Sequence, residues 1–260
     1  MMKHRTGIGL LRRLTFSCLF LLVLDTTHSH GEDQKNASVP GWKEEFSQKS
    51  LDPKMWRITR SGDFKENRVD IIDVGHGKPL DLRLRLRANT LRTNDKTVKF
   101  LGVRGVPQIN FKDGVEISLD LDWNDQANGS YLTAAIYLCP TITGKNPQEE
   151  PDWIRLEYLG VPPGRNARAA VASRSKGRVQ WLYTEGWPDA NKSGRKIGLQ
   201  HLTLRIDSKR WVIYENGHEL YRAEAHELDF TRAYLYLQMS SHSNYPAREV
   251  YFDHIAVRPP

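Results

Sequence analysis

The fold is decided by the stretch from Ala233 to Val257, which reads AYLYLQMSSHSNYPAREVYFDHIAV. Its first run alternates between two faces, as an extended strand with one buried side does. One face carries Tyr234, Tyr236, Gln238 and Ser240, and the other carries Leu235, Leu237 and Met239. A second run, Glu249 to Val257, follows a polar corner. The stretch predicts a hairpin with one apolar face and one hydrogen-bonding face.

The same alternation recurs through most of the chain, with turn residues such as Lys112-Asp113-Gly114 between the runs. The predicted strands are Val69–Val74, Leu80–Arg87, Val98–Arg104, Val115–Trp123, Ser130–Leu138, Trp153–Leu159, Ala167–Ser173, Val179–Thr184, Gln200–Asp207, Trp211–Glu215, Tyr234–Ser240 and Arg248–Val257. Helical periodicity is weak everywhere, and Glu219–Leu228 comes nearest to it. Many short strands with almost no helix predict an all-β, two-sheet antiparallel β-sandwich.

The first residues look like a targeting segment. A basic start precedes Leu14–Leu24, an apolar run too short to span a bilayer comfortably. We expect residues 1–29 to be a cleaved signal peptide, with an uncleaved anchor as the alternative. Residues 30–40 are then a disordered leader, and residues 41–260 form the β-sandwich domain. The expected location is secreted or periplasmic, with no membrane contact after cleavage.

The net charge bears on the kind of partner that the protein binds, and the cysteine content bears on how the domain is stabilised. The whole chain carries a net charge of +7, of which the signal peptide accounts for +3. In the rest of the chain, basic and acidic residues are too nearly equal in number to predict a nucleic-acid partner. Their balance is compatible with an acidic polysaccharide as the partner. Cys18 leaves with the signal, so Cys139 has no partner for an intramolecular disulfide. The domain must therefore be stabilised by its apolar core.

The polar corner between Asp122 and Tyr131 is the first candidate site, with Asp122, Asn124 and Tyr131 as candidate contacts. Carboxylates and amides pair with sugar hydroxyls, and an aromatic ring can stack on a pyranose. The alternative is a turn at Asn128-Gly129 whose Asx side chains cap their own backbone.

A second candidate lies on the predicted strand at 153–159, where Trp153, Arg155 and Glu157 share one face. Glu157 beside an arginine is either a nucleophile of lowered pKa or half of an ion pair. A tryptophan exposed on that face indicates ligand binding. Farther along, Trp181 fits a core position.

The closing corner supplies a third candidate set of Tyr236, Gln238, His242, Tyr245 and Arg248. His242 and Tyr245 could exchange protons while Arg248 neutralises a uronate carboxylate, as a polysaccharide lyase requires. The alternatives are non-catalytic ligand contacts, or a loop whose side chains satisfy their own backbone.

The overall pattern resembles the concanavalin A-like lectin/glucanase superfamily, in particular its bacterial secreted members. The resemblance covers nearly all of residues 41–258. It is carried by Phe46–Trp56, by the strand pair Val115–Leu138, by Trp211–Gly217 and by the ending Phe252-Asp253-His254-Ile255-Ala256-Val257. It implies a jelly roll of two curved antiparallel sheets. It also implies a possible structural calcium ion at Asp253, the place of a calcium-binding aspartate in several members.

The superfamily's catalytic patterns match only in part. Its laminarinase-type hydrolases carry Glu-x-Asp-x-x-Glu on one strand. The nearest stretch here is Glu150-Pro-Asp152-Trp-Ile-Arg155, with Arg155 in place of the second glutamate and Glu157 two positions later. Its alginate-lyase-type members use Arg, Gln, His and Tyr on adjacent strands, and the closing corner supplies those residue types without that spacing.

The sequence thus predicts a secreted jelly roll whose concave sheet binds a polysaccharide or other glycan. The alternatives are an enzyme of the same fold and a structural cell-surface protein. As an enzyme it would be a hydrolase using Glu157, or a lyase using His242 and Tyr245.

Overall fold

The computed structural model describes residues 41–60, 67–75, 80–88, 99–123, 133–144, 146–159, 168–186, 198–224, 228–241 and 248–260. The predicted signal peptide and leader lie outside these residues. None of the described residues belongs to a helix long and apolar enough to cross a membrane.

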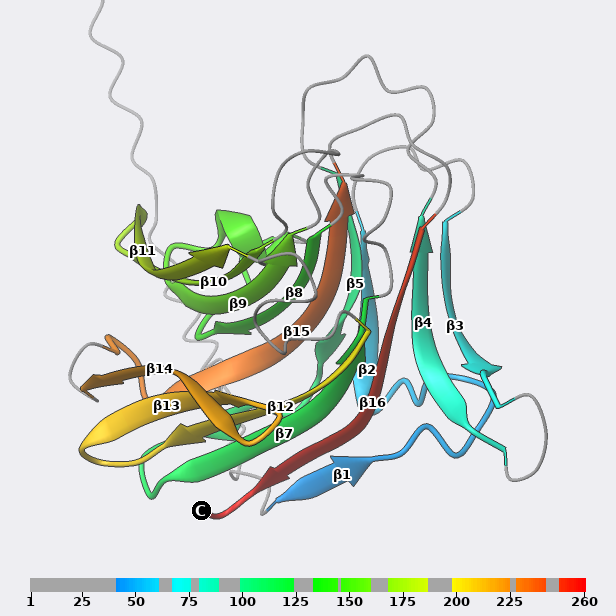
Figure 1. The fold of residues 1–260 in the computed structure, drawn as a ribbon, viewed down its shortest axis with the longest axis horizontal. Coiled ribbons are helices and arrows are strands. Elements are labelled where there is room, and N and C mark those ends of the chain that lie inside the picture. The colour runs from blue at the N-terminus through cyan, green and yellow to red at the C-terminus, as the bar shows by residue number, and fades with distance from the viewer. Residues whose placement is uncertain are drawn as a thin grey trace, which may run out of the picture. The chain divides into compact units, whose positions relative to one another are not determined.

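The described strands form two antiparallel sheets, called sheet A and sheet B (Figure 1). Sheet A has the order β14 (His218–Glu224), β13 (Arg210–Glu215), β12 (Leu199–Ile206), β7 (Val115–Asp122), β16 (Arg248–Arg258), β4 (Leu82–Ala88) and β3 (Arg68–Asp73), with β1 (Trp42–Glu44) paired to β16. Sheet B has the order β11 (Arg178–Gly186), β10 (Arg168–Ser175), β9 (Trp153–Leu159), β8 (Thr133–Cys139), β15 (Arg232–Ser241), β5 (Lys99–Gly105) and β2 (Trp56–Arg60), with β6 (Ile109–Asn110) paired to β15. A short 3₁₀ helix, η1 (Pro147–Glu149), precedes β9.

The two strands of the closing stretch belong to different sheets. β15 lies between β8 and β5 in sheet B, whereas β16 lies between β7 and β4 in sheet A. The predicted hairpin is therefore wrong, although both strands form as expected. Alternation reveals the buried face of a strand but carries no information about its partner.

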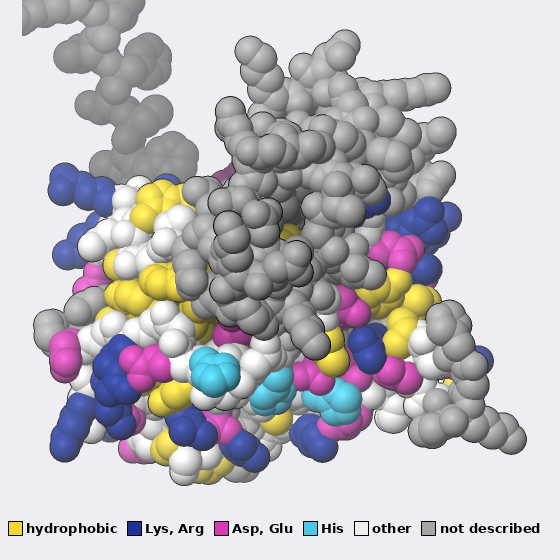
Figure 2. All heavy atoms as spheres, viewed as in Figure 1, with side chains coloured by type: hydrophobic (Ala, Val, Ile, Leu, Met, Phe, Trp, Pro, Cys, Tyr) yellow, Lys and Arg dark blue, Asp and Glu magenta, His cyan; other side chains and the backbone are white. Residues whose placement is uncertain are grey.

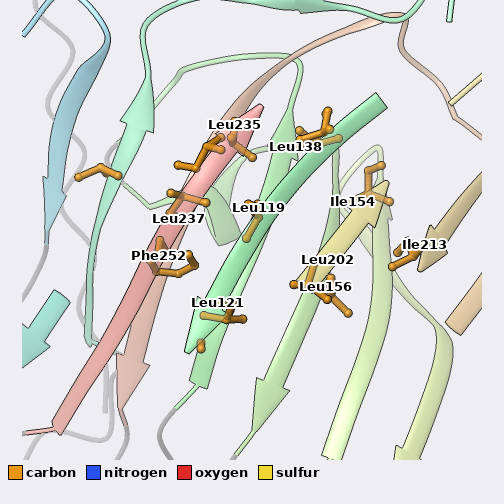
Figure 3. Close-up of a cluster of buried hydrophobic side chains, with 14 of the residues drawn as sticks. Leu119, Leu121, Leu138, Ile154, Leu156, Leu202, Ile213, Leu235, Leu237 and Phe252 are labelled. Carbon is orange, nitrogen blue, oxygen red and sulfur yellow. The ribbon is translucent and has the colours of Figure 1, made fainter. Parts of the chain in front are cut away.

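The core lies between the sheets and uses the predicted apolar faces. Leu235 and Leu237 of β15 are fully buried and belong to one cluster with Leu119, Leu121 and Phe252 of sheet A. Figure 3 shows these side chains gathered between the two layers. Truncating one of them to alanine would cost about 2–5 kcal/mol of stability, because the space left behind is only partly refilled.

All of the predicted strands are present, with ends that differ by a few residues. β1, β2, β6 and β14 were not predicted as strands. The stretch that comes nearest to a helical period, Glu219–Leu228, begins within a strand, because residues 218–224 form β14. A register shift in the pairing of β13 with β14 leaves Leu220 and Ala223, three positions apart, on the buried side. This β-bulge produces a spacing that resembles a helix.

The outer face of sheet A carries closely paired charges. Asp120 of β7 accepts hydrogen bonds from both His201 Nδ1 (2.7 Å) and His254 Nδ1 (2.9 Å) when these nitrogens are protonated. Acidic, basic and histidine side chains are interspersed over β7, β12 and β16 in Figure 2. Glu116 of the same strand is buried and receives hydrogen bonds from Arg205 (2.6 Å) and Arg258 (2.9 Å).

Glu116 makes the stability of sheet A sensitive to acid. Burial acts to raise the pKa of Glu116, but hydrogen bonds from Arg258 and Arg205 outweigh it and hold the pKa below 4.5. A carboxylate whose pKa is lowered by folding stabilises the protein above its unfolded pKa, and this contribution disappears as the pH falls through the folded value.

We expect Glu116→Gln to lower the free energy of unfolding by about 1–2 kcal/mol at pH 7, with a smaller loss at pH 3. Urea unfolding at several pH values between 3 and 7 measures this difference. An equal loss at both ends of the range would show that the carboxylate charge is not responsible.

Candidate functional site

The candidate site is the concave face, defined here as the side chains of sheet B that point away from sheet A. Figure 1 shows that β8, β9 and β10 are curved. One row of directly opposed residues crosses it from edge to edge. In strand order from β11 to β2 the row is Trp181, Ala172, Arg155, Tyr137, Tyr236, Arg104 and Arg57.

Arg155 lies within a box of aromatic rings. Its guanidinium carbon is 5.0 Å from the ring centroid of Trp153, 5.1 Å from that of Trp181 and 5.7 Å from that of Tyr137. Its Nη1 also donates a hydrogen bond to Tyr137 Oη at 3.2 Å. Stacking of this kind favours arginine because the planar cation interacts with aromatic faces while it still donates hydrogen bonds.

Arg155 is also paired with Glu157 on the same strand. Arg155 Nε lies 3.2 Å from Glu157 Oε2, and both side chains are buried. Burial acts to lower the pKa of Arg155, but Tyr137 and Glu157 outweigh it and raise the pKa. Burial raises the pKa of Tyr137 to about 12, so that hydroxyl stays protonated at neutral pH.

β15 adds hydrogen-bonding groups beside this pair. Tyr236, Gln238 and Ser240 follow one another on the concave face, and all three are buried. Gln238 Nε2 donates to Ser240 Oγ at 2.9 Å. The buried Gln238 Oε1 accepts no hydrogen bond from the described residues. It is therefore an acceptor whose hydrogen-bonding capacity the described residues leave unused.

The row is accessible at its two ends. Trp181 on the edge strand β11 is 48% exposed, although its ring packs against Arg155. At the opposite end Arg57 is exposed and Arg104 is half-buried. An aromatic ring and two guanidinium groups thus flank a floor of buried polar side chains.

Comparison with solved structures finds similar folds. A β-1,3-1,4-glucanase (lichenase) from a mouse hindgut metagenome matches with a TM-score of 0.56 and 12% identity, covering 85% of this chain and all of the other. The catalytic domain of a Thermotoga petrophila laminarinase matches with a TM-score of 0.53 and 18% identity, covering 83% and 95%. The T. cruzi calreticulin globular domain matches with a TM-score of 0.56 and 14% identity, covering 84% and 87%.

The chain has the concanavalin A-like jelly-roll fold. Comparison with protein-family models and with curated proteins gives no match. At these identities the likeness of the jelly rolls extends to the arrangement of strands alone.

The jelly roll brings together only some of the predicted site residues. Trp153, Arg155, Glu157, Tyr236 and Gln238 share the concave face, as their alternation predicts. Trp153, expected to be exposed, is buried and packs edge-on against Tyr137. Trp181, expected in the core, lies at the exposed edge because β11 is the last strand of the sheet.

Two predicted residues lie elsewhere in the jelly roll. Asp122, a candidate glycan contact, is on β7 of sheet A and is 3.7 Å from Arg83, so it does not lie on the concave face with Glu157. Arg248 begins β16 opposite Ala88 of sheet A and is not on the concave face. The predicted polar side of Asp122 along its strand is correct, but the strand belongs to the other sheet. Four further candidates, Asn124, Tyr131, His242 and Tyr245, lie outside the described residues.

The acidic residues before β9 have structural roles. Glu150 is fully buried and accepts hydrogen bonds from the Thr143 backbone nitrogen (2.7 Å) and the Thr141 hydroxyl (2.9 Å). Asp152 accepts a hydrogen bond from the Lys176 backbone nitrogen at 2.7 Å. Among the described side chains on the strands of sheet B, Glu157 is the one carboxylate.

Asp253 is the predicted calcium ligand. It lies on β16 opposite Asp120, beside a bulge at which His254 has a φ of 48°. Burial raises the pKa of Asp253, and its Oδ1 has no hydrogen-bond donor among the described residues. Its Oδ2 is 3.2 Å from His254 Nδ1, and the positive charge of Arg83 acts to lower the same pKa. No cluster of three acidic, histidine or cysteine side chains suited to a metal occurs among the described residues. These side chains alone do not form a calcium site, and calcium binding stays a prediction.

The sequence interpretation overlooked Tyr137, Arg104 and Arg57 as parts of the concave face. Tyr137 has the same phase on β8 as Ala135 and Cys139, which made its face look apolar. Arg104 ends a predicted strand, and Arg57 lies on β2, which was not predicted. The phase of Arg104 within its strand was the one available signal.

Proposed function

We propose that this protein binds a polysaccharide on the concave face of sheet B. The observation that carries the proposal is the single row of aromatic, guanidinium and phenol side chains, which ends in the exposed ring of Trp181. Aromatic faces suit the apolar faces of sugar rings, and hydrogen-bonding groups such as Gln238 Oε1 suit sugar hydroxyls. A secreted or periplasmic location would give the protein access to extracellular glycans.

The comparisons support the choice of ligand class. Two of the three structures described above are named as glucanases, which act on polysaccharides. They support the polysaccharide as partner, and they favour an enzyme over a protein that only binds.

We expect Trp181→Ala to weaken polysaccharide binding by about tenfold, because one stacking surface is lost. Affinity electrophoresis of the protein from residue 41 onward, in gels that contain a panel of polysaccharides, measures the effect. Val179→Ala is the matched control, since Val179 is exposed on the same strand and lies two positions away. Equal retardation of wild type and Trp181→Ala would show that Trp181 is not part of the binding surface.

Glycoside hydrolysis is the second candidate function, favoured by the names of the similar structures and by Glu157 on β9. A retaining glycosidase needs two carboxyl groups about 5–5.5 Å apart, and an inverting one needs them about 6.5–9.5 Å apart. Glu157 has no described carboxylate partner on the strands of sheet B, and Arg155 holds it in an ion pair. This geometry supports binding more directly than hydrolysis.

An assay of reducing ends separates the two functions. A hydrolase releases new reducing ends, and Glu157→Gln abolishes their release, whereas a binding protein retains the polymer without cleaving it. A lyase using His242 and Tyr245 would instead form unsaturated uronates, which absorb in the ultraviolet. A structural role without a ligand is disfavoured by the bent, charged concave face.

A further inference from the structure

The arginines on the two outer faces of the sandwich have different partners. On sheet A they are paired with carboxylates. Arg83 lies 2.6 Å from Asp81, Arg85 lies 2.8 Å from Asp70, and Arg205 lies 2.6 Å from Glu116. The sequence thus supplies a negative partner wherever sheet A exposes these cations.

On sheet B, Arg57 and Arg104 have no carboxylate partner among the residues that the structure describes. They lie directly opposite each other on β2 and β5, an arrangement in which like charges repel. Arg57 donates only to backbone oxygens of Pro53 and Trp56 among the described residues. Arg104 packs over the ring of Tyr234 at 5.6 Å, and its buried Nε has no hydrogen-bond acceptor among them.

Glu157, the carboxylate described on the strands of sheet B, does not relieve this repulsion. Glu157 is on β9, which is separated from β5 by β8 and β15, and it is paired with Arg155. An external anion placed between Arg57 and Arg104 would remove the repulsion and accept hydrogen bonds from both. Arginine pairs with carboxylates and sulfates through two parallel donors, which gives charge and orientation together.

Neutral groups of the kind that a sugar requires lie next to this pair. Arg104 is opposite Tyr236, and Gln238 is two positions farther along β15 on the same face. Diagonal neighbours of this kind are about 7–8 Å apart in a sheet, which is comparable with the width of one sugar residue and its substituent. The unpartnered Gln238 Oε1 can therefore accept a ring hydroxyl while Arg104 holds an acidic substituent.

We propose that Arg57 and Arg104 form an anion subsite, which makes the ligand an acidic polysaccharide bearing carboxylate or sulfate groups. This inference rests on the proposed function, because it places the acidic group at one end of the same concave face. Trp181 contacts the sugar at the other end of the row.

The test compares polymers that differ only in charge. Polygalacturonate is paired with its fully methyl-esterified form for the carboxylate, and dextran sulfate is paired with dextran for the sulfate. Affinity for each is measured with wild type, Arg57→Gln, Arg104→Gln and the control Arg222→Gln. Arg222 is an exposed arginine of β14, paired with Glu219, so its removal changes the net charge equally without touching the concave face.

Circular dichroism and thermal unfolding establish that each variant is folded. If Arg104→Gln fails to fold, the exposed Arg57→Gln carries the test.

We expect wild type to bind one of the two charged polymers at least tenfold more tightly than its neutral partner. Each concave-face variant should lose about tenfold in affinity for that polymer, and Arg222→Gln less than twofold. Added salt should weaken binding of the charged polymer.

Equal affinity for charged and neutral polymers, unchanged in Arg57→Gln and Arg104→Gln, would overturn the anion subsite and leave the proposed function in place. Equal losses in the concave-face variants and in Arg222→Gln would also overturn it, because net charge alone would then explain the binding. Failure to bind these polymers or any neutral polysaccharide of the panel would overturn both proposals.

Discussion

Replacement of Arg155 by methionine is expected to lower the free energy of unfolding by about 3–5 kcal/mol at pH 7, because it leaves the buried carboxylate of Glu157 without its cation. The guanidinium also fills the space between the rings of Trp153, Trp181 and Tyr137, which a methionine side chain can occupy only in part. Urea unfolding at pH 7, followed by tryptophan fluorescence, measures the loss.

A double variant identifies the source of the loss. Arg155→Met with Glu157→Leu removes both charges, and it should recover most of the stability because no buried ion remains unpaired. The single variant should also regain stability relative to wild type as the pH is lowered, since Glu157 can then take up a proton. Equal stability of the single and double variants would show that the loss in free energy of unfolding comes from aromatic packing and not from the ion pair.

Gly102→Ala is the second substitution with a large expected effect. A Cβ at this position would lie 2.3 Å from the Leu237 carbonyl oxygen and 3.0 Å from the Gln238 Cα. Both are backbone atoms of β15, so no side-chain rotation relieves the overlap. We expect a loss of about 3 kcal/mol or more, because β5 and β15 must separate where they pair. Thermal unfolding measures the loss.

Gly105 provides the matched control on the same strand. A Cβ there would find its nearest atom, the Leu235 carbonyl oxygen, at 3.6 Å, which is an ordinary contact distance. Gly105→Ala should therefore shift the midpoint of thermal unfolding by only a small amount. Comparable shifts for both alanine variants would mean that the cost comes from the backbone freedom of glycine and not from the close approach to Leu237.

The sequence predicts the faces of the strands well, for a simple physical reason. Side chains alternate along a strand, and burial favours apolar residues on one side, so Tyr236 and Gln238 could be assigned to the face opposite Leu235 and Leu237 without a structure. Most of the predicted strands have the buried side that their alternation indicates where the structure describes them, but β11 is an exception, because Val179 and Trp181 are exposed on this edge strand. The fold class follows from the same signal.

The partners of each strand in a sheet cannot be predicted from this alternation. Hydrogen bonds between strands involve the backbone, which is the same in every residue, so the sequence of β7 does not say that its neighbours are β12 and β16. For the same reason, alternation along β7 does not reveal that Asp122 and Glu157 lie on different sheets. The sequence also does not reveal the row from Trp181 to Arg57, because β8 to β11 follow one another in the chain whereas β15, β5 and β2 come from distant parts of it.

The places of β15 and β16 in the middle of their sheets have a consequence for how the protein folds during synthesis. β5 and β2 are joined to the rest of sheet B only through β15, and β4 and β3 are joined to the rest of sheet A only through β16. A ribosome must therefore translate residues 232–258 before either sheet can close. Until then the nascent chain presents unpaired strand edges, which are prone to aggregation. The folding of both sheets therefore waits for these residues, and during that interval a chaperone would be of most use to this protein.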